Sequence, residues 1–591
     1  MKNYLCPINN LIKKMLQIHM IQNIIAIMGA IIIGFILGKN IPNATTVWEL
    51  GDEAGYLSNA VYFLGKNWDD VRAEMPYFAY GYSVFLIPIY LITNTGVQLI
   101  QGAMYINLLF AIGTYFLIIY FLEKVGRQEN RIITSAISFA TCLNSYLCCN
   151  VLKVNCESLC VFWYCLTALI LYKTIQKRKT CYFVLLGIIC SYLFFIHTRM
   201  IVIVLALMFT LFISFWLHNL KDYFIRLLVF LGTFLVFFIS LYLVKNSIVK
   251  YASALNTASN AVQGNLIDGN YILNRITWLF MPENLKLYVL SFISKIFYVI
   301  IVSSGTILFG YADLCKSIFQ KQLNNDTVEA FSVKLFFLLG MTFMIITCTI
   351  NGAGLLENYC YFFYSRYYEN TLIPVIAFSV LGVITTKWNS KIYFKFIIVA
   401  IIVGITTSIL KIFLYTENIW IDTARIPGFS WLVNNATSYQ NMIFWGTIII
   451  TLAIVIYLLC SRFKVKTIII LLIVCVMTWK STSLGIERIN GAHINSKPDT
   501  EIAAQILGSE DYNTVYMIDD ESYKFPGYYS KMQVLLKDIP LKVIHKDELE
   551  QIDKLPKDTW ILTYTTTVLR ESYLLELTNV MKGTVFELWK K

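Results

Sequence analysis

Charged residues are scarce in this sequence. Asp, Glu, Lys and Arg make up 14% of the 591 residues, whereas hydrophobic residues make up 57%. A soluble domain normally carries about a quarter charged residues, so this composition excludes an ordinary soluble protein, although the length alone would fit about four soluble domains. Repeated apolar runs of about twenty residues, each long enough to cross a bilayer as a helix, indicate a polytopic membrane protein instead.

Motifs that would indicate other classes of protein are also missing. The sequence has no nucleic-acid-binding motif, no metal-ligand spacing and no glycine-rich phosphate loop. Much of the net charge of +12 lies in short Lys and Arg clusters between apolar runs, where it sets membrane orientation, so we expect no nucleic-acid partner. The 14 cysteines form no disulfide framework, because many lie in or beside apolar segments as small buried hydrophobes.

The apolar runs predict an α-helical protein with about thirteen membrane spans. The first run, near Ile18–Leu37, is followed by no small-residue cleavage site, so we expect a retained anchor rather than a signal peptide. A shorter apolar stretch, Tyr82–Ile92, precedes the second span. Further spans are expected near Gln98–Leu122, Ile132–Val151, Leu159–Tyr172, Cys181–Ile196, Ile201–Leu217, Ile225–Val244, Tyr288–Tyr311, Val333–Ile350, Thr371–Thr386, Phe394–Leu414, Asn441–Cys460 and Thr467–Leu484.

Charge at the loop ends predicts the orientation. Lys2 and Lys13 precede the first span, and short basic joints such as Lys173–Lys179 recur on the same side, which the positive-inside bias places in the cytoplasm. We therefore expect a multi-pass plasma membrane protein with a cytoplasmic N-terminus. Residues 1–484 would form the membrane domain, in which residues 39–82 would be a first external loop with helices along the membrane surface.

The composition becomes polar and charged after Leu484. Strand patterns alternate with helical patterns at Tyr528–Leu536 and Glu571–Val580, so residues 485–591 predict a small extracytoplasmic α/β domain. Since no phosphate-binding loop is present, a structural or acceptor-handling module is the default interpretation. The expected strands are Thr514–Ile518, Leu541–Ile544, Trp560–Tyr564 and Thr584–Leu588.

An acidic pair opens a helix in the first external loop. Asp52 and Glu53 precede apolar residues that recur at helical spacing from Ala54 to Leu64. One interpretation is structural: Asp52 caps the helix and Glu53 complements the helix dipole. The other is catalytic: a carboxylate general base, held where a lipid head group meets a water-borne acceptor. Because Asp is a preferred cap, the pair taken alone favours the structural interpretation.

Further candidates lie in external turns beside spans. Glu157 is either solvated or paired with Lys153, or it is a functional carboxylate, since acidic residues at the membrane edge are costly and tend to be functional. Arg199 either snorkels to the surface or clamps a phosphate, for which a guanidinium fork is well shaped. His197, in the same turn, is more often structural than catalytic in such a place.

A last feature, Tyr364–Asn370, ends an external loop just before a late span. Its tyrosines fit an aromatic anchoring belt, whereas Arg366 fits such a belt less well. The acidic and cationic candidates thus converge on one face of the membrane, and this convergence is worth more than any single residue.

Such a face suits the transfer of a sugar from a polyprenyl phosphate. The departing phosphate needs no general acid, so one carboxylate to deprotonate the acceptor hydroxyl and cations to stabilise the phosphate would suffice. Asp52 could serve as that base, and Arg199 and Arg366 could serve as those cations. A nucleotide-sugar site is not needed.

The order of these features resembles the GT-C superfamily of polyprenyl-phosphate-sugar glycosyltransferases, and in particular the protein O-mannosyltransferases and the lipid A aminoarabinose transferase. The resemblance covers about residues 18–390 in order and spacing. The motifs that carry it are Asp52-Glu53, Pro76–Tyr82, Asn155–Leu159, Thr198-Arg199 and Arg366–Asn370. A single proline stands in the second motif, which departs from the family pattern.

The resemblance implies roles for these residues. Asp52 would be the catalytic base within the acidic pair, while Arg199 and Arg366 would face the lipid phosphate. Glu53 and Glu157 would help to shape the site, and a divalent cation on Asp52 and Glu157 is an open option. The residues expected to bind substrate are Glu157, His197, Arg199, Arg366, Tyr367 and Tyr368.

The leading prediction is therefore an inverting glycosyltransferase that moves a sugar from a polyprenyl-phosphate donor to an extracytoplasmic glycan, lipid or protein. A lipid-linked saccharide transporter or flippase stays open as an alternative, as does a polysaccharide polymerase or ligase. Transport usually needs charged or broken helices near the bilayer midplane, whereas most charges here lie at loop ends. The expected partners are the donor, the acceptor and membrane lipids.

Overall fold

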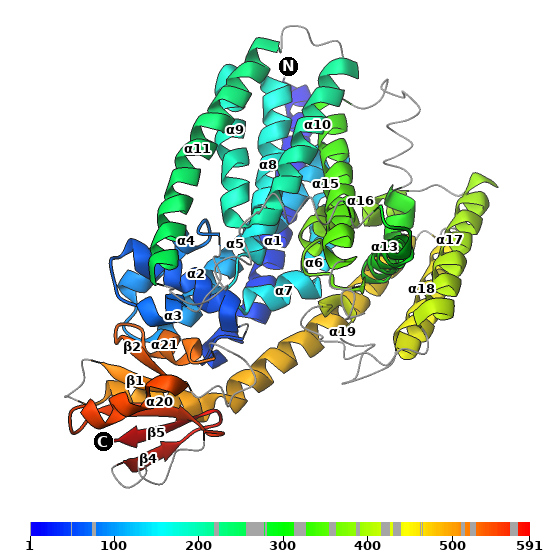
Figure 1. Cartoon of the computed structure of the whole chain (residues 1–591). Helices are drawn as coiled ribbons and strands as arrows, with labels where there is room; N and C mark the ends of the chain where they lie inside the picture. The colour runs from blue at the N-terminus through cyan, green and yellow to red at the C-terminus, as the bar shows by residue number, and fades with distance from the viewer. Residues whose placement is uncertain are drawn as a thin grey trace.

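The computed structural model is built mainly of helices, with one small sheet near the C-terminus (Figure 1). The residues that the structure describes are 2–48, 50–73, 79–217, 224–255, 277, 280–311, 327–353, 362–385, 390–414, 426–429, 439–460, 463, 465–509, 514–519, 528–567 and 577–591. Pro76, Tyr77 and Phe78 of the proline-containing motif lie outside the described residues.

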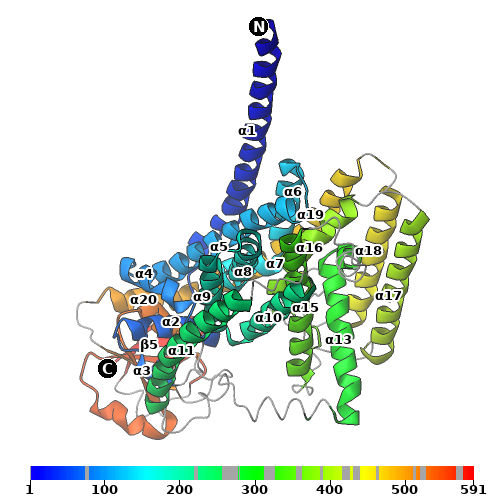
Figure 2. The same ribbon diagram turned by 90° about the horizontal axis from the view of Figure 1, so that it is seen from above.

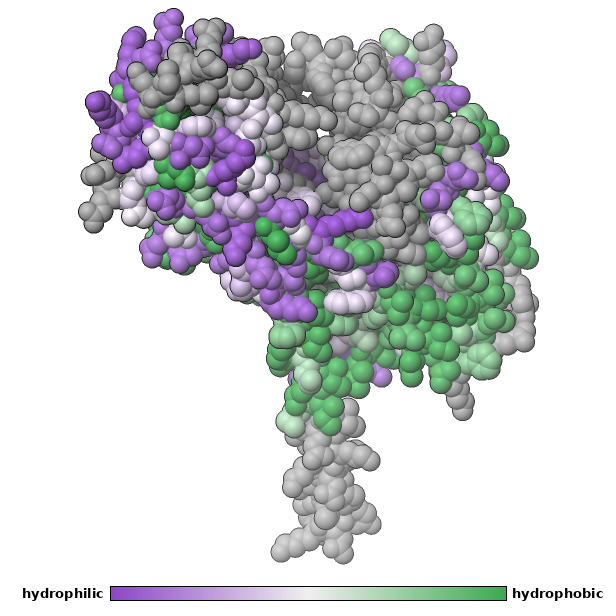
Figure 3. All heavy atoms as spheres, turned by 90° about the horizontal axis from the view of Figure 1, so that it is seen from below, coloured by the Kyte–Doolittle hydropathy of each residue, from purple (hydrophilic) through white to green (hydrophobic). Residues whose placement is uncertain are grey.

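Ten of the described helices are long and apolar enough to cross a membrane. Figure 3 shows apolar surface over the helix bundle and polar surface gathered on the C-terminal domain, as expected for a bundle that sits in lipid. The ten helices are α1 (Lys2–Gly38), α5 (Gly96–Lys124), α8 (Glu157–Lys177), α10 (Ile201–Leu217), α11 (Phe224–Leu255), α13 (Pro282–Val302), α15 (Val328–Ala353), α17 (Ser390–Leu414), α18 (Tyr439–Cys460) and α19 (Lys466–Asn495).

A broken helix contributes up to one more span. Helices α6 (Arg131–Cys142) and α7 (Ser145–Val151) pass the length and hydropathy test together but are bent by 67° at the break between them. The Asn144 side chain accepts a hydrogen bond from the Tyr146 amide at 2.9 Å. Asparagine is a preferred N-cap, so the local sequence explains why a new helix starts at this point.

The expected spans fall on described helices, although Ile132–Val151 is divided between α6 and α7 and Tyr288–Tyr311 runs past the end of α13. The α-helical polytopic fold is therefore confirmed. The number of thirteen spans stays a prediction, because α9 (Thr180–Ile196) and α16 (Glu369–Thr385) are each 17 residues long, near the lower limit for crossing a bilayer. The apolar stretch before the second span forms α4 (Ser83–Ile92). Short 3₁₀ turns are η1 (Ile41–Asn43), η2 (Thr198–Met200) and η6 (Pro427–Phe429).

The loop after α1, which the sequence predicts to be external, contains two described helices, α2 (Leu50–Phe63) and α3 (Asp69–Ala73), and we call it the first loop. Helix α2 packs against α4, and the Ser83 hydroxyl donates to the Tyr56 carbonyl at 2.7 Å. Both residues are buried, so this bond fixes α2 against the start of α4.

The C-terminal domain contains a five-stranded sheet in the order β2-β1-β3-β5-β4. Strands β2, β1 and β3 run parallel, whereas β5 and β4 are antiparallel to their neighbours. Helix α19 continues to Asn495, so the domain boundary expected after residue 484 stays a prediction. The elements are α20 (Lys497–Leu507), β1 (Val515–Asp519), α21 (Ser530–Leu536), β2 (Leu541–His545), η7 (Lys546–Lys554), β3 (Trp560–Tyr564), β4 (Thr578–Lys582) and β5 (Phe586–Lys590).

One expectation about this domain is wrong. The sequence pattern predicts a helix over Glu571–Val580, but Thr578–Lys582 form strand β4, and residues 571–576 lie outside the described residues. Strand β4 pairs with β5, with Asn579 opposite Trp589. Pairing with a neighbouring strand outweighs a weak local preference for helix.

The C-terminal domain docks on the first loop at one end of the bundle, and the start of α1 points away from it (Figure 1, Figure 2). Lys66 forms an ion pair with Asp538, and the Trp68 indole N–H donates to the Lys537 carbonyl at 2.7 Å. Helix α21 contacts both α2 and α5. The domain therefore supports α2 from the side opposite to the membrane helices.

Candidate active site

Asp52 lies in the first turn of α2, where the helix dipole favours a carboxylate. Its side chain is 32% exposed, and Oδ2 lies 2.6 Å from Nη2 of Arg366. The dipole explains why an acidic residue suits this turn. It does not explain a pairing with an arginine from a distant part of the chain, which favours the functional interpretation of Asp52.

Glu157 opens α8 and is completely buried. One carboxylate oxygen, Oε1, accepts a hydrogen bond from Nε of Arg366 at 3.1 Å. The other, Oε2, accepts from the Tyr146 hydroxyl at 2.6 Å and from Arg199. Burial of a carboxylate is tolerated when charged and polar partners surround it in this way, so Glu157 holds both arginines in place.

Arg199 lies in η2, the tight turn between α9 and α10. His197 precedes it and accepts the Arg199 backbone N–H on Nδ1 at 3.3 Å. The Arg199 guanidinium lies 4.8 Å from the centre of the Tyr367 ring, a cation–π distance. Burial lowers the pKa of His197 well below its ordinary range, and the cations Arg199 and Arg366 lower it further. The imidazole is therefore neutral, as its acceptor role requires.

These contacts form an alternating row of charges, Asp52–Arg366–Glu157–Arg199, which we call the charge row. Side-chain exposure is 32% at Asp52, 13% at Arg366 and 8% at Arg199, and Glu157 is covered completely. Asp52 is therefore the member of the charge row that is most open to solvent, whereas Glu157 is covered by its partners.

Two of the expected residues point into the packing around the charge row. Glu53 is buried and accepts the Trp48 backbone N–H at 3.2 Å, within electrostatic reach of Lys531 in the C-terminal domain. Consecutive helical residues point about 100° apart, which separates Glu53 from Asp52. Tyr368 is also buried, edge-on to another ring in the bundle. The expected residues that the structure brings together are Asp52, Glu157, His197, Arg199, Arg366 and Tyr367.

Two tyrosines at the site are not among the expected site residues. Tyr146 donates to Glu157, and nothing in its local sequence distinguishes it from other apolar-segment tyrosines. Tyr56 follows Asp52 by one helical turn, and its hydroxyl lies 2.9 Å from Sγ of Cys156. The spacing of four residues was the available signal for Tyr56, because residues so spaced share a helix face.

The two carboxylates expected to hold a divalent cation are bridged by an arginine. Arg366 bonds both Asp52 and Glu157, so a cation between them would have to displace a guanidinium. Among the described residues, thiols of Cys156 and Cys160 lie with a Glu157 oxygen within 4.8 Å of one another, but the Glu157 oxygens already accept from the arginines. This arrangement does not fit a hard divalent ion, which needs several free oxygen ligands.

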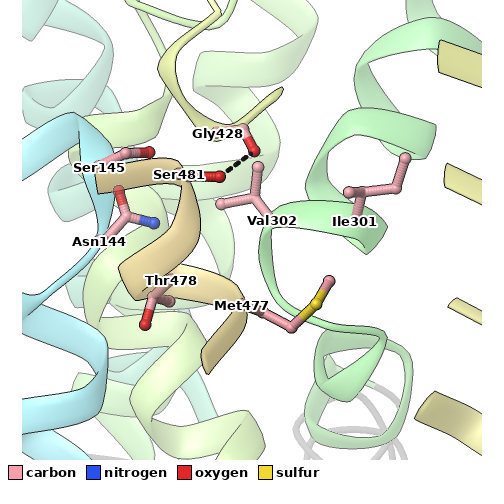
Figure 4. Close-up of a pocket in the computed structure, with 8 residues that line it drawn as sticks. All are labelled: Asn144, Ser145, Ile301, Val302, Gly428, Met477, Thr478 and Ser481. Atoms are coloured by element: carbon pink, nitrogen blue, oxygen red, sulfur yellow. Dashed lines mark hydrogen bonds between the residues drawn. The ribbon is translucent and has the colours of Figure 1, made fainter. Parts of the chain in front are cut away.

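A small cavity lies between α7, α13, α19 and η6 (Figure 4). Its space suits about one water molecule, so it cannot hold a sugar in this arrangement. The residues that line it are Asn144, Ser145, Ile301, Val302, Gly428, Met477, Thr478 and Ser481.

Comparison with known proteins identifies the fold. No family model and no curated protein matches the chain. ArnT from Cupriavidus metallidurans, solved bound to undecaprenyl phosphate, has a TM-score of 0.51 at 10% identity, over 96% of this chain and 97% of that chain. The apo Archaeoglobus fulgidus oligosaccharyltransferase has a TM-score of 0.43 at 11% identity, over 92% of this chain and 69% of that chain. The chain therefore has the fold of ArnT, and the expected polytopic helical fold with a small C-terminal domain is confirmed.

Proposed function

We propose that this protein is an inverting glycosyltransferase that uses a polyprenyl-phosphate sugar as donor. The proposal rests on the two ion pairs of Arg366, one with the partly exposed Asp52 and the other with the buried Glu157. A base that substrate can reach thus stands next to a cation held at a fixed distance. The fold adds support, since ArnT of the same fold was solved with undecaprenyl phosphate bound.

In the proposed reaction, Asp52 takes the proton of the acceptor hydroxyl while the oxygen attacks the anomeric carbon. The bond between that carbon and the phosphate oxygen breaks, and the electron pair leaves on the phosphate. Arg366 and Arg199 stabilise the charge of the departing polyprenyl phosphate. Attack from the side opposite to the leaving group inverts the anomeric centre. Glu157 keeps both guanidinium groups aligned, so little reorganisation is needed when the phosphate charge develops.

The proposed substrates follow from the surroundings of the charge row. The donor tail would lie in lipid along the bundle, and its phosphate would meet the arginines at the end of the bundle that carries the C-terminal domain. We place this end outside the cytoplasm, in keeping with the basic joints on the opposite side. The acceptor is then an extracytoplasmic glycan, lipid or protein that approaches Asp52 from water.

The decisive experiment uses the full chain reconstituted in bilayer discs with a panel of synthetic polyprenyl-phosphate sugars. Release of free polyprenyl phosphate together with a glycosylated acceptor, followed by mass spectrometry, supports the proposal. Movement of the intact lipid across a vesicle without cleavage would indicate a transporter. Products that grow by many sugar units would indicate a polymerase.

Replacing Asp52 by Asn tests the proposed base. The amide keeps the size of the side chain but cannot take a proton, so we expect turnover to fall about a hundredfold or more, as for other general bases. Asp69→Asn is the matched control, because Asp69 lies in α3 of the same loop and its acceptor bond from Tyr251 survives the change. Undiminished turnover in the Asp52 variant would remove the assignment.

A further inference from the structure

The segment that carries Arg366 is held at both ends by one membrane helix. At its start, the Lys295 ammonium donates to the Phe362 carbonyl at 3.3 Å. At its end, the Tyr298 hydroxyl donates to the Glu369 carboxylate. Lys295 and Tyr298 lie three residues apart in α13, so they project from the same face of the helix.

All four contacting residues are buried. Lys295 and Glu369 are 1% exposed, and Tyr298 and Phe362 are not exposed at all. Lys295 also donates to the Ser291 hydroxyl at 2.7 Å, one turn earlier in α13. Ionisable residues buried within a membrane bundle are costly, and they are retained when they have a function. Neither Lys295 nor Glu369 has a part in the sugar-transfer reaction proposed above.

The Tyr298 hydroxyl is itself fixed from the other side. It accepts the Gly428 backbone N–H at 3.0 Å, and the Gly428 carbonyl accepts the Ser481 hydroxyl at 2.8 Å, as Figure 4 shows. A Cβ at position 428 would overlap Cγ2 of Val302 and lie 2.8 Å from the Tyr298 hydroxyl, so any side chain there would have to displace one or both of them. A continuous chain of hydrogen bonds therefore runs from α19 through Tyr298 to the segment that carries Arg366.

We infer that Lys295 and Tyr298 are positioning residues that set the place of the Arg366 guanidinium between Asp52 and Glu157. The consequence for catalysis rests on the proposed function, whereas the positioning itself does not. Three residues separate Phe362 from Arg366, and two separate Arg366 from Glu369, so release of either end gives the guanidinium room to move. A displaced Arg366 would bind the donor phosphate less well while leaving the acceptor side intact.

The first experiment measures Arg366 directly and needs no turnover. Tyr298→Phe and Lys295→Met are compared with the wild-type chain for the rate at which phenylglyoxal modifies Arg366, followed by peptide mass spectrometry. We expect the rate to rise severalfold in both variants, since the guanidinium is 13% exposed when the segment is held. The controls are Tyr457→Phe and Lys245→Met, which remove a buried tyrosine hydroxyl bonded to the Ser304 carbonyl and a buried lysine of α11.

The second experiment is a double-mutant cycle with Arg366→Lys, read as KM for the donor and KM for the acceptor. Each α13 variant should raise the donor KM about tenfold, as for the loss of a hydrogen bond to a charged group, and leave the acceptor KM unchanged. In the Arg366→Lys background the same variants should change the donor KM by less than about twofold, because residues that act through one another are not additive.

The outcomes separate the two proposals. Unchanged modification of Arg366 in both α13 variants overturns the positioning role, whatever the activity. Additive effects in the cycle overturn it as well, because they show action independent of Arg366. Faster modification in a chain that transfers no sugar from any donor would leave the positioning role in place and remove the proposed function. Tyr298→Phe loses a single oxygen atom. If Lys295→Met fails to fold, the rate of Arg366 modification can still be measured in Tyr298→Phe.

Discussion

Glu157 is the residue on which the stability of the charge row depends. Its carboxylate is covered completely and faces Arg199 and Arg366, which are 8% and 13% exposed. Glu157→Gln would leave two poorly hydrated guanidinium groups without their shared counter-charge. Breaking one partner of a buried ion pair typically costs about 3–5 kcal/mol.

We therefore expect Glu157→Gln to lower the thermal unfolding midpoint of the detergent-solubilised protein and to reduce transfer. Glu123→Gln is the matched control, because Glu123 pairs with Arg131 where both side chains are partly exposed, and such pairs contribute at most about 1 kcal/mol. Equal midpoints for the two variants would contradict the proposed role of Glu157.

His197 gives the site a pH dependence whose sign can be derived. Burial first, and then Arg199 and Arg366, hold the pKa of His197 well below its ordinary value. Below about pH 6.5 the unfolded chain binds a proton here that the folded chain does not, so the folded state loses stability as the pH falls. Above this pH both states are neutral at His197, and the contribution vanishes.

His197→Gln removes this titration while keeping a side-chain acceptor for the Arg199 N–H. We expect the unfolding midpoint of the wild-type chain to fall more steeply between pH 7 and about pH 5 than that of the variant. Parallel curves for the two proteins would show that His197 titrates normally in the folded state.

At the scale of elements, the contact between α5 and α21 joins the membrane bundle to the C-terminal domain. A Cβ at Gly96 would meet the backbone of Val534 and Leu535 of α21 at less than van der Waals distance. Backbone atoms cannot move aside as a flexible side chain can. Gly96 is therefore required for the close approach of these two helices.

Gly96→Ala should loosen the docking of the C-terminal domain and cost about 1–3 kcal/mol, as for overpacking of a tight contact. Limited proteolysis of the reconstituted protein would show it as faster release of the C-terminal domain. Gly404→Ala in α17 is the control, because an added Cβ there meets nothing within 4 Å. Identical proteolysis of the two variants would show that α21 tolerates a side chain at position 96.

The break between α6 and α7 shows which features of a helix the local sequence explains and which depend on packing. Asn144 caps α7, which explains locally why a new helix can start there. The bend of 67° at this break sets the direction of α7, and Tyr146 in its first turn meets Glu157. The sequence predicts a single span over Ile132–Val151, so the break is not expected from it, and the angle of the break depends on the helices packed around it.

At the scale of the whole molecule, the C-terminal domain and the start of α1 lie on opposite sides of the helix bundle (Figure 1, Figure 2). If the basic joints face the cytoplasm, the C-terminal domain must face outward. Cys181 is exposed at the start of α9, directly after the basic joint Lys173–Lys179, and so serves as a reporter for the cytoplasmic side.

We expect a cysteine introduced by Lys546→Cys, at an exposed position of the C-terminal domain, to react with a membrane-impermeant maleimide in intact cells. Cys181 should react only after the membrane is permeabilised. Labelling in the reverse order would place the charge row in the cytoplasm and exclude an extracytoplasmic acceptor.

The spans, the surface helix of the first loop and four of the strands could be read from the amino-acid order, because hydrophobicity, capping and alternation act between near neighbours. The same local properties singled out Asp52, Arg199 and Arg366 as a group on one face of the membrane. Residue order left open which of these side chains would touch, since pairing across helices depends on how the helices pack.

Packing placed Arg366 between Asp52 and Glu157, turned Glu53 towards the C-terminal domain and recruited Tyr146 and Tyr298 from helices without any local signal. Thr578–Lys582 form strand β4 for the same reason, because their backbone pairs with β5 in the folded domain. These outcomes share one physical reason: a side chain's partner is supplied by residues far along the chain, and their approach is set by burial of the helices as a whole.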